Sequence, residues 1–307
     1  MQPRTHLASL LSMILVTACA APAFAETSTE EVAKLFADAL VAAKPKGPSL
    51  DRDRGLIAFP ADQATYEKGP HFGRWRWPEF TGDRWGMYNV EVTYVSVVPR
   101  MGVQFSIGET KSKGYLPQTG SMETEKTVVL NRIYIADTMT HPVGALTGDD
   151  SNGETFRLKR ISLRPAPEGS EIAQDFDGAV TLAANQATTF SRQMRFEPKP
   201  EKNCLGVWTE AADWAEWHFS VHEGGKFTVQ LLHGCGSGNE GSEVEVWIND
   251  EKRTFKVADT GGFQSWKPVD LGVVELPEGD HRVVINPLSK AKVAVLDVQK
   301  LVLTPQS

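Results

Sequence analysis

Apolar and polar residues alternate along most of the chain after residue 50, and this pattern predicts β-strands. Successive side chains of a strand point to opposite faces, so a period of two indicates a strand with one buried face. Glycine, proline, asparagine and aspartate interrupt these runs at intervals of about ten residues. The pattern is typical of an all-β sandwich or barrel. The clearest runs cover residues 88–95, 103–107, 227–231, 244–248 and 283–285.

The first 25 residues have a different pattern, which is that of an export signal. Basic Arg4 precedes a mainly apolar core over residues 7–16, and Ala23-Phe24-Ala25 fits the small-x-small site that signal peptidase reads. The core is too short for a membrane span of about 20 residues. A second interpretation is a bacterial lipobox, Val16-Thr-Ala-Cys19, which would leave a lipidated cysteine. Both interpretations predict a periplasmic or secreted protein.

Residues 26–50 are expected to form an N-terminal helix and a linker. Ser28-x-x-Glu31 is a capping box, and apolar residues follow it at helical spacing. The segment Lys44-Pro-Lys-Gly-Pro48 then ends the helix, which is predicted over 28–43.

An ordered internal repeat divides the rest of the chain into two similar modules. The segment from Gly55 to Thr65 recurs between Gly178 and Thr188, and Thr119-Gly120 recurs as Thr260-Gly261. Between these points Gly73-Arg-Trp75 is matched to Gly206-Val-Trp208. The offset between the copies grows from 123 to 141 residues, so insertions lie early in the second copy. The prediction is a tandem pair of β-sandwich modules over 51–168 and 171–306.

Net charge limits the partners of such a protein. The chain of 307 residues has 32 basic and 39 acidic side chains, a net charge of -7. No basic run stands out that could displace counterions from phosphates, which argues against nucleic acid. No segment after the leader is apolar enough to span a membrane.

Two cysteines remain after the leader, Cys204 and Cys235. In an oxidising compartment such a pair predicts a disulfide, which would stabilise the fold by roughly 3–4 kcal/mol. The alternative is two buried free thiols.

The second module resembles the galactose-binding-like jelly-roll sandwiches, and most of all carbohydrate-binding module family six. The resemblance rests on Trp214-Ala-Glu-Trp217-His-Phe-Ser-Val221, on Thr260-Gly-Gly-Phe-Gln-Ser-Trp266 and on Leu271 to Val283. It extends to the first module through the repeat. The resemblance implies a jelly-roll fold and a module of the type that is appended to secreted bacterial sulfatases and glycosidases.

Modules of that family usually hold a structural calcium ion between an acid in the first strand and an aspartate near the last strand. This chain departs from the pattern. In module 1 Asp62 stands at the first position, but Arg157 stands near the last strand; in module 2 Asn185 stands at the first position and Asp297 near the last strand. Each module has lost one of the two charges. Calcium requires several oxygen ligands with net negative charge, so no cofactor and no metal ion is predicted, and a structural calcium ion is the less favoured alternative.

Sugars are bound by aromatic faces together with planar polar side chains. Trp75 and Trp77 share one face of an extended segment and alternate with arginines, so they are candidates for a stacking platform; the alternative is a lid over the core. Phe263 and Trp266 lie in a glycine-rich turn, and Asn286 is placed in a loop before the last strand. The resemblance assigns sugar contact to the Asn286 position, and an Asn-Pro turn is the alternative.

These observations predict an exported, non-catalytic protein that binds polysaccharide through two tandem jelly-roll modules. The sequence holds no G-x-S-x-G, H-E-x-x-H or C-x-x-C motif. One alternative is a structural or protein-interaction accessory of a secreted sulfatase or glycosidase, with a partner enzyme. A second alternative is a glycoside hydrolase whose two carboxyl groups only the fold would bring together.

Overall fold

The computed structural model describes residues 48, 50–148 and 153–306. The predicted signal peptide, the lipobox at Cys19 and the predicted helix over 28–43 lie outside this part of the chain. Contacts assign Gly47–Ser307 to one unit, which contains both modules. Among the described residues, no helix combines the length and the apolar character needed to cross a bilayer.

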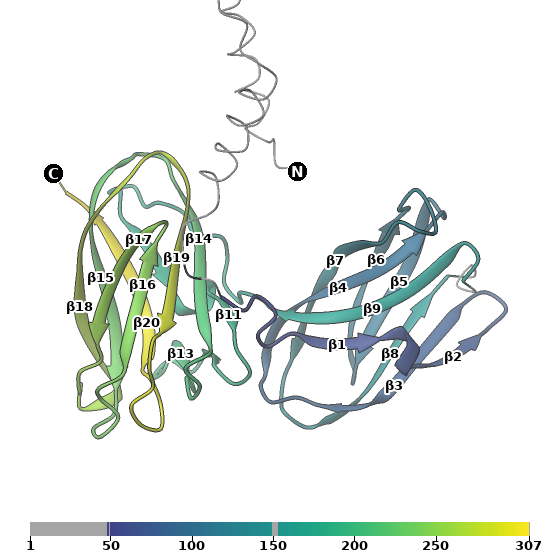
Figure 1. Ribbon diagram of the computed structural model, residues 1–307, viewed down its shortest axis with the longest axis horizontal. Helices are drawn as coiled ribbons and strands as arrows, with labels where there is room; N and C mark the ends of the chain where they lie inside the picture. The colour runs from purple at the N-terminus through teal and green to yellow at the C-terminus, as the bar shows by residue number, and fades with distance from the viewer. Residues whose placement is uncertain (1–47, 49, 149–152, 307) are drawn as a thin grey trace, which may run out of the picture. The chain divides into compact units, whose positions relative to one another are not determined.

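Module 1 is a β-sandwich made of two antiparallel sheets (Figure 1). The four-stranded sheet has the order β1 (Ile57–Pro60), β9 (Phe156–Pro165), β4 (Gly86–Ser96) and β7 (Lys126–Ile135). The five-stranded sheet has the order β2 (Thr65–Lys68), β3 (Gly73–Thr81), β8 (Thr140–Thr147), β5 (Arg100–Ile107) and β6 (Thr110–Pro117). A short 3-10 turn, η2 (Ala61–Gln63), joins β1 to β2.

Module 2 repeats this arrangement with two additional short strands. Its six-stranded sheet has the order β12 (Arg195–Glu197), β13 (Cys204–Gly206), β20 (Asp297–Pro305), β15 (Gly225–Cys235) and β18 (Gly262–Leu276), and β10 (Val180–Ala183) also pairs with β20. Its five-stranded sheet has the order β11 (Thr188–Phe190), β14 (Trp214–Val221), β19 (Gly279–Pro287), β16 (Glu243–Ile248) and β17 (Glu251–Lys256). The turn η3 (Ala184–Gln186) follows β10.

Each module has its own apolar core between its two sheets. Strand β4 alternates buried and half-buried residues, as the period of two predicts, and Val90, Val92 and Phe105 are fully buried in module 1. The core of module 2 includes Trp208 and Trp217. The prediction of an all-β fold of two jelly-roll sandwiches is confirmed.

Equivalent strands of the two modules make the same individual hydrogen bonds. The Thr119 hydroxyl donates to the carbonyl of Ser96 at the end of β4, and the Thr260 hydroxyl donates to the carbonyl of Cys235 at the end of β15. In both modules the backbone N–H of the strand residue returns a bond to that hydroxyl. The same strand order and the same bonds at matched residues are what a duplication predicts.

One match of the repeat is wrong. The strand order makes β3 equivalent to β14, whereas Gly206 ends the additional strand β13. The indole N–H of Trp77 donates to the carbonyl of Pro60 at 2.7 Å, and that of Trp217 donates to Ala183 at 2.8 Å. Both acceptors close the first strand of their module, so Trp217 is the structural counterpart of Trp77, and Trp208 is not the counterpart of Trp75.

Candidate functional site

The tryptophans predicted as a stacking platform lie in the core of module 1. Trp75 and Trp77 share one face of β3, as predicted, but that face points between the sheets, and their exposed fractions are 6% and 7%. Arg74 and Arg76, which alternate with these tryptophans, occupy the outer face instead. The prediction of an exposed platform at these indoles is therefore wrong. A period of two identifies which residues share a face, and burial of the larger apolar surface decides which face turns inward.

Phe263 and Trp266 are half-buried at the start of β18. A side chain added at Gly236 would come within 2.7 Å of the Phe263 ring, and one at Gly234 within 3.1 Å of the Trp266 ring. The Trp266 ring therefore packs on the backbone of β15 at Gly234, and the Phe263 ring packs on Gly236 just after that strand; their role in binding stays a prediction.

Asn286 is not in a loop, because it lies within strand β19 of module 2. Its side-chain amide donates to Glu245 at 2.8 Å. The five predicted residues thus fall in three separate places, the core of module 1 and both sheets of module 2, and they do not form one site.

The predicted disulfide does not form, because Cys204 and Cys235 are free, buried thiols. Strand β20 lies between β13 and β15, which places the two cysteines two strand spacings apart, about 9.5 Å. A disulfide requires Cα atoms no more than about 7 Å apart. Burial raises the pKa of both thiols.

Cys204 belongs instead to a buried polar cluster with Glu197 and Asp297, whose side-chain O and S atoms lie within 4.8 Å of one another. The Lys202 ammonium binds Glu197 at 2.8 Å, and the Asp297 carboxylate accepts bonds from Cys204 and from Gln264. Burial, together with the charge of Glu197, raises the pKa of Asp297 to about 7. A thiol and a competing ammonium do not fit the all-oxygen ligand set of calcium.

A buried polar network lies where module 1 meets module 2, and Arg84 anchors it. This residue precedes β4, and its guanidinium Nη1 donates to the Thr189 hydroxyl at 2.8 Å, to the Ser191 hydroxyl at 2.8 Å and to the Met194 carbonyl at 2.6 Å. Arg84 is 5% exposed, and its Nε has no hydrogen-bond partner. Burial lowers the pKa of Arg84.

The chain segment before β1 forms the second side of this junction. Arg54 donates to the buried Asp213 at 2.8 Å and also pairs with Glu210. Gly55 has a φ of +79°, and a Cβ placed on it would lie 2.0 Å from the Ser191 carbonyl oxygen. Only glycine allows the two backbones to approach so closely.

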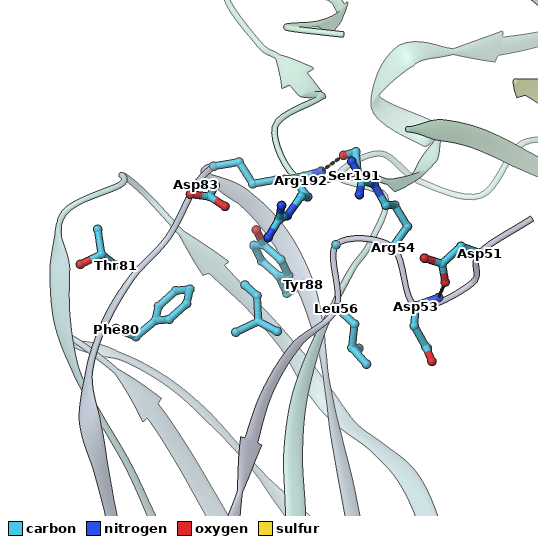
Figure 2. Close-up of a pocket in the computed structure, with 13 residues that line it drawn as sticks. Asp51, Asp53, Arg54, Leu56, Phe80, Thr81, Asp83, Tyr88, Ser191 and Arg192 are labelled. Carbon is cyan, nitrogen blue, oxygen red and sulfur yellow. Dashed lines mark hydrogen bonds between the residues drawn. The ribbon is translucent and has the colours of Figure 1, made fainter. Parts of the chain in front are cut away.

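These contacts enclose a cavity of about 420 Å³, which we call the junction cavity (Figure 2). It has an apolar side and a polar side. Leu56, Ile57 and Phe80 supply apolar surface, and Thr81 and Tyr88 supply hydroxyl groups. The charged lining consists of three carboxylates and three guanidinium groups, namely Asp51, Asp53, Asp83, Arg54, Arg84 and Arg192.

Most of these charged groups are already bound, but two are free to meet a ligand. Asp53 pairs with Arg164 at 3.2 Å, and Asp51 accepts a bond from the Asp53 backbone at 2.9 Å. Asp83 and Arg192 are exposed at the rim, and within the described residues neither side chain has an ion pair. The cavity therefore combines charged groups that are already paired with two exposed charged groups at its rim, the acceptor Asp83 and the donor Arg192.

Sequence reasoning missed the junction cavity because its parts come from positions about 100 residues apart. Arg84 and Ser191 carry no local signal of their contact. The run Asp51-Arg-Asp-Arg-Gly55 was one usable signal, since alternating charges before a glycine suggest a segment held between charged surfaces.

Comparison with families of known proteins gives a match within module 2. The family model of a domain of unknown function, DUF5077, matches residues 182–307. No curated protein matches the chain.

Solved structures similar to the chain include carbohydrate-binding modules. The family 35 module of Abf62 from Cellvibrio japonicus has a TM-score of 0.33 and 15% identity, covering 42% of this chain and 94% of that one. The C-terminal family 6 module of the marine laminarinase LamC from Zobellia galactanivorans has a TM-score of 0.32 and 13% identity, covering 41% of this chain and 98% of that one.

A GH26-CBM35 β-(1,4)-mannanase from Podospora anserina has a TM-score of 0.30 and 17% identity, covering 43% of this chain but only 28% of its own length. At this level of similarity, the ligands of these proteins say nothing about the ligand of the present chain. The chain is similar to these modules, and its second module is similar to the DUF5077 domain.

Proposed function

We propose that the protein is an exported, non-catalytic carbohydrate-binding protein whose junction cavity holds a sugar unit. The observation that carries this proposal is the cavity itself, where an apolar side faces fixed hydroxyl, carboxylate and guanidinium groups. A pyranose presents C–H surface on its faces and hydroxyls at its edge, so it matches such a lining. The volume of about 420 Å³ is within the range of small-molecule sites.

The rigidity of the lining favours binding rather than motion on ligand entry. Arg84 and Arg54 are held by partners in module 2, so the free groups Asp83 and Arg192 are displayed from fixed backbone. A pre-organised site loses little conformational entropy on binding. Export is part of the proposal and rests on the leader pattern of residues 1–25.

The experiment is a glycan array with the purified protein, followed by calorimetry on the best ligand. We expect Asp83→Asn and Arg192→Ala each to weaken binding roughly tenfold, because each removes a charge-assisted hydrogen bond. Asp250→Asn and Lys290→Ala remove the same charges from exposed positions elsewhere and are the controls. If a sugar binds and both cavity variants bind it as the native protein does, the junction cavity is not the site.

The hydrolase alternative is separated in the same experiment. Three carboxylates line the cavity, so a glycosidase acting there would release reducing ends from its ligand. We expect no release over hours with native protein. Release that Asp83→Asn abolishes would replace the binding proposal with hydrolysis.

A further inference from the structure

The outer face of the five-stranded sheet of module 1 carries a second surface, which is separate from the junction cavity. The register aligns side chains into two rows that cross β3, β8, β5 and β6. One row is Arg74, Leu146, Gln104 and Lys113, and the other is Arg76, Gly144, Ser106 and Lys111. We call these two rows the basic face; the strands that carry it, β3, β8, β5 and β6, are labelled in Figure 1.

Four cations stand on this face and one carboxylate opposes them. Glu67 on the neighbouring strand β2 bridges Arg74 at 3.3 Å and Arg76 at 3.2 Å. Lys111 and Lys113 are exposed, and they form no ion pair within the described part of the chain. The basic face therefore carries a local excess of positive charge on a chain whose net charge is -7.

A shallow hollow separates the arginines from the lysines. Its volume is about 250 Å³, and it is lined by Arg74, Arg76, Gln104, Ser106 and Leu146. Gly144 has no side chain, so the floor of the hollow stays low. A Cβ at this position would lie 3.2 Å from the Trp75 carbonyl oxygen. An amide and a hydroxyl thus lie between two pairs of cations.

The edge of the basic face adds an exposed aromatic ring. Tyr115 on β6 lies opposite Gly102, and its side chain is 62% exposed. The Arg100 guanidinium stands 3.6 Å from the ring centroid, which extends the positive charge along β5.

In module 2 the outer face of the equivalent sheet is covered by a turn of the chain around Leu50, Asp51 and Arg52. There Phe190 and Trp214 stack with centroids 3.8 Å apart, and Leu50 packs on them. Arg52 binds Glu216 at 2.6 Å, and the Trp214 indole donates to the Asp51 carbonyl at 3.1 Å. On module 2 the chain itself places a cation on an acidic, aromatic face. On module 1 the same face is basic, and its lysines Lys111 and Lys113 are exposed.

From this geometry we propose that the basic face binds an acidic polysaccharide built from uronate units. The Glu67 carboxylate already sits between Arg74 and Arg76, which shows that the arginine pair accepts a carboxylate. Gln104 and Ser106 offer hydrogen bonds to hydroxyl groups between the charged positions. Single-stranded nucleic acid is bound through successive bases stacked on several aromatic side chains. Tyr115 supplies a single ring at the edge of this face, and the side chains of Trp75 and Trp77 point into the core.

The test compares two polymers with the same backbone, polygalacturonate and highly methyl-esterified pectin, by affinity electrophoresis and calorimetry at low salt. The native protein should bind polygalacturonate, and methyl esterification should remove the interaction. Lys111→Ala with Lys113→Ala should weaken binding roughly five- to thirtyfold. Lys252→Ala with Lys256→Ala removes two exposed lysines from the equivalent strand of module 2 and should change binding less than twofold.

Three results would overturn the proposal: equal losses in both double variants, equal binding to the esterified polymer, or equally tight binding of dextran sulfate, polyglutamate or duplex DNA. The junction cavity is tested independently, because Asp83→Asn should leave polygalacturonate binding unchanged. Binding that depends on Asp83 and not on Lys111 and Lys113 would assign uronate to the junction cavity instead. Failure of the glycan array with intact binding to polygalacturonate would remove only the cavity proposal.

Discussion

Replacing Asp297 by asparagine removes a buried acid whose ionisation the fold opposes. The side chain is 5% exposed, and the carboxylate of Glu197 lies in the same cluster. Burial and this neighbouring charge raise the pKa of Asp297 from 3.8 to about 7. An asparagine oxygen still accepts the hydrogen bonds that Cys204 and Gln264 give to Asp297. The substitution therefore changes charge and largely preserves contacts.

The magnitude follows from the two pKa values. A carboxyl group whose pKa is raised by folding makes its full contribution to stability below about pH 4. This contribution is lost as the pH rises through about 7, because the buried carboxyl group must then ionise. A difference of about three pH units corresponds to roughly 4 kcal/mol at ~1.4 kcal/mol per unit. Relative to the native protein, Asp297→Asn should gain up to this amount between pH 4 and pH 8, or roughly 10 °C in melting temperature.

The assay is urea unfolding of native and variant protein at several pH values, with Asp250→Asn as an exposed control. Taking the difference between the two proteins cancels the other groups that titrate in this range. Parallel curves from pH 4 to pH 8 would refute the reasoning. A variant that is less stable at pH 8, with a native melting temperature that EDTA lowers, would instead show that Asp297 binds a cation.

Three further predictions concern packing. Gly55→Ala should destabilise the protein by about 2–4 kcal/mol, because its Cβ would meet the Ser191 carbonyl; a change under ~0.5 kcal/mol in urea unfolding would contradict this. Trp77→Phe should lower the free energy of unfolding by about 1–3 kcal/mol, because it removes the indole hydrogen bond to the Pro60 carbonyl. An unchanged melting curve would place this indole outside the core. Cys204 and Cys235 should react with a thiol reagent only after unfolding. If these two thiols still fail to react in denaturant without a reductant, the two cysteines form a disulfide.

Much of the fold could be predicted from the sequence because its signals are local. The period of two locates strands wherever one face is buried. The repeat also carried correct atomic detail, since Thr119 and Thr260 were matched and make the same hydrogen bonds. The match between Gly73–Trp75 and Gly206–Trp208 failed, because it falls where module 2 has the additional short strands β12 and β13, which have no counterpart in module 1.

The candidate sites could not be predicted, because they depend on which strands become neighbours. Alternation placed Trp75 and Trp77 together but could not tell which face of β3 would be buried. The separation of Cys204 from Cys235 follows from the position of β20 between their strands, a long-range property of the sheet order. The basic face was hidden for the same reason: its two rows cross four strands, β3, β8, β5 and β6, so no stretch of sequence reads as a basic run.

The outer faces of the two five-stranded sheets differ in chemistry although their strand orders are the same. In module 2 the outer face combines a buried acid, Glu216, with stacked Phe190 and Trp214, and Arg52 lies over both rings. Although burial alone would raise it, the pKa of Glu216 is lowered by bonds from His218 and Arg52, so the covering segment stabilises the charge beneath it. Such a face serves the structure, since removing the covering segment would take away the Arg52 partner of Glu216 and expose the Phe190 and Trp214 rings. The outer face in module 1 bears the exposed lysines Lys111 and Lys113 instead. Their exposure is the reason why we propose this face as the binding surface for an acidic polysaccharide.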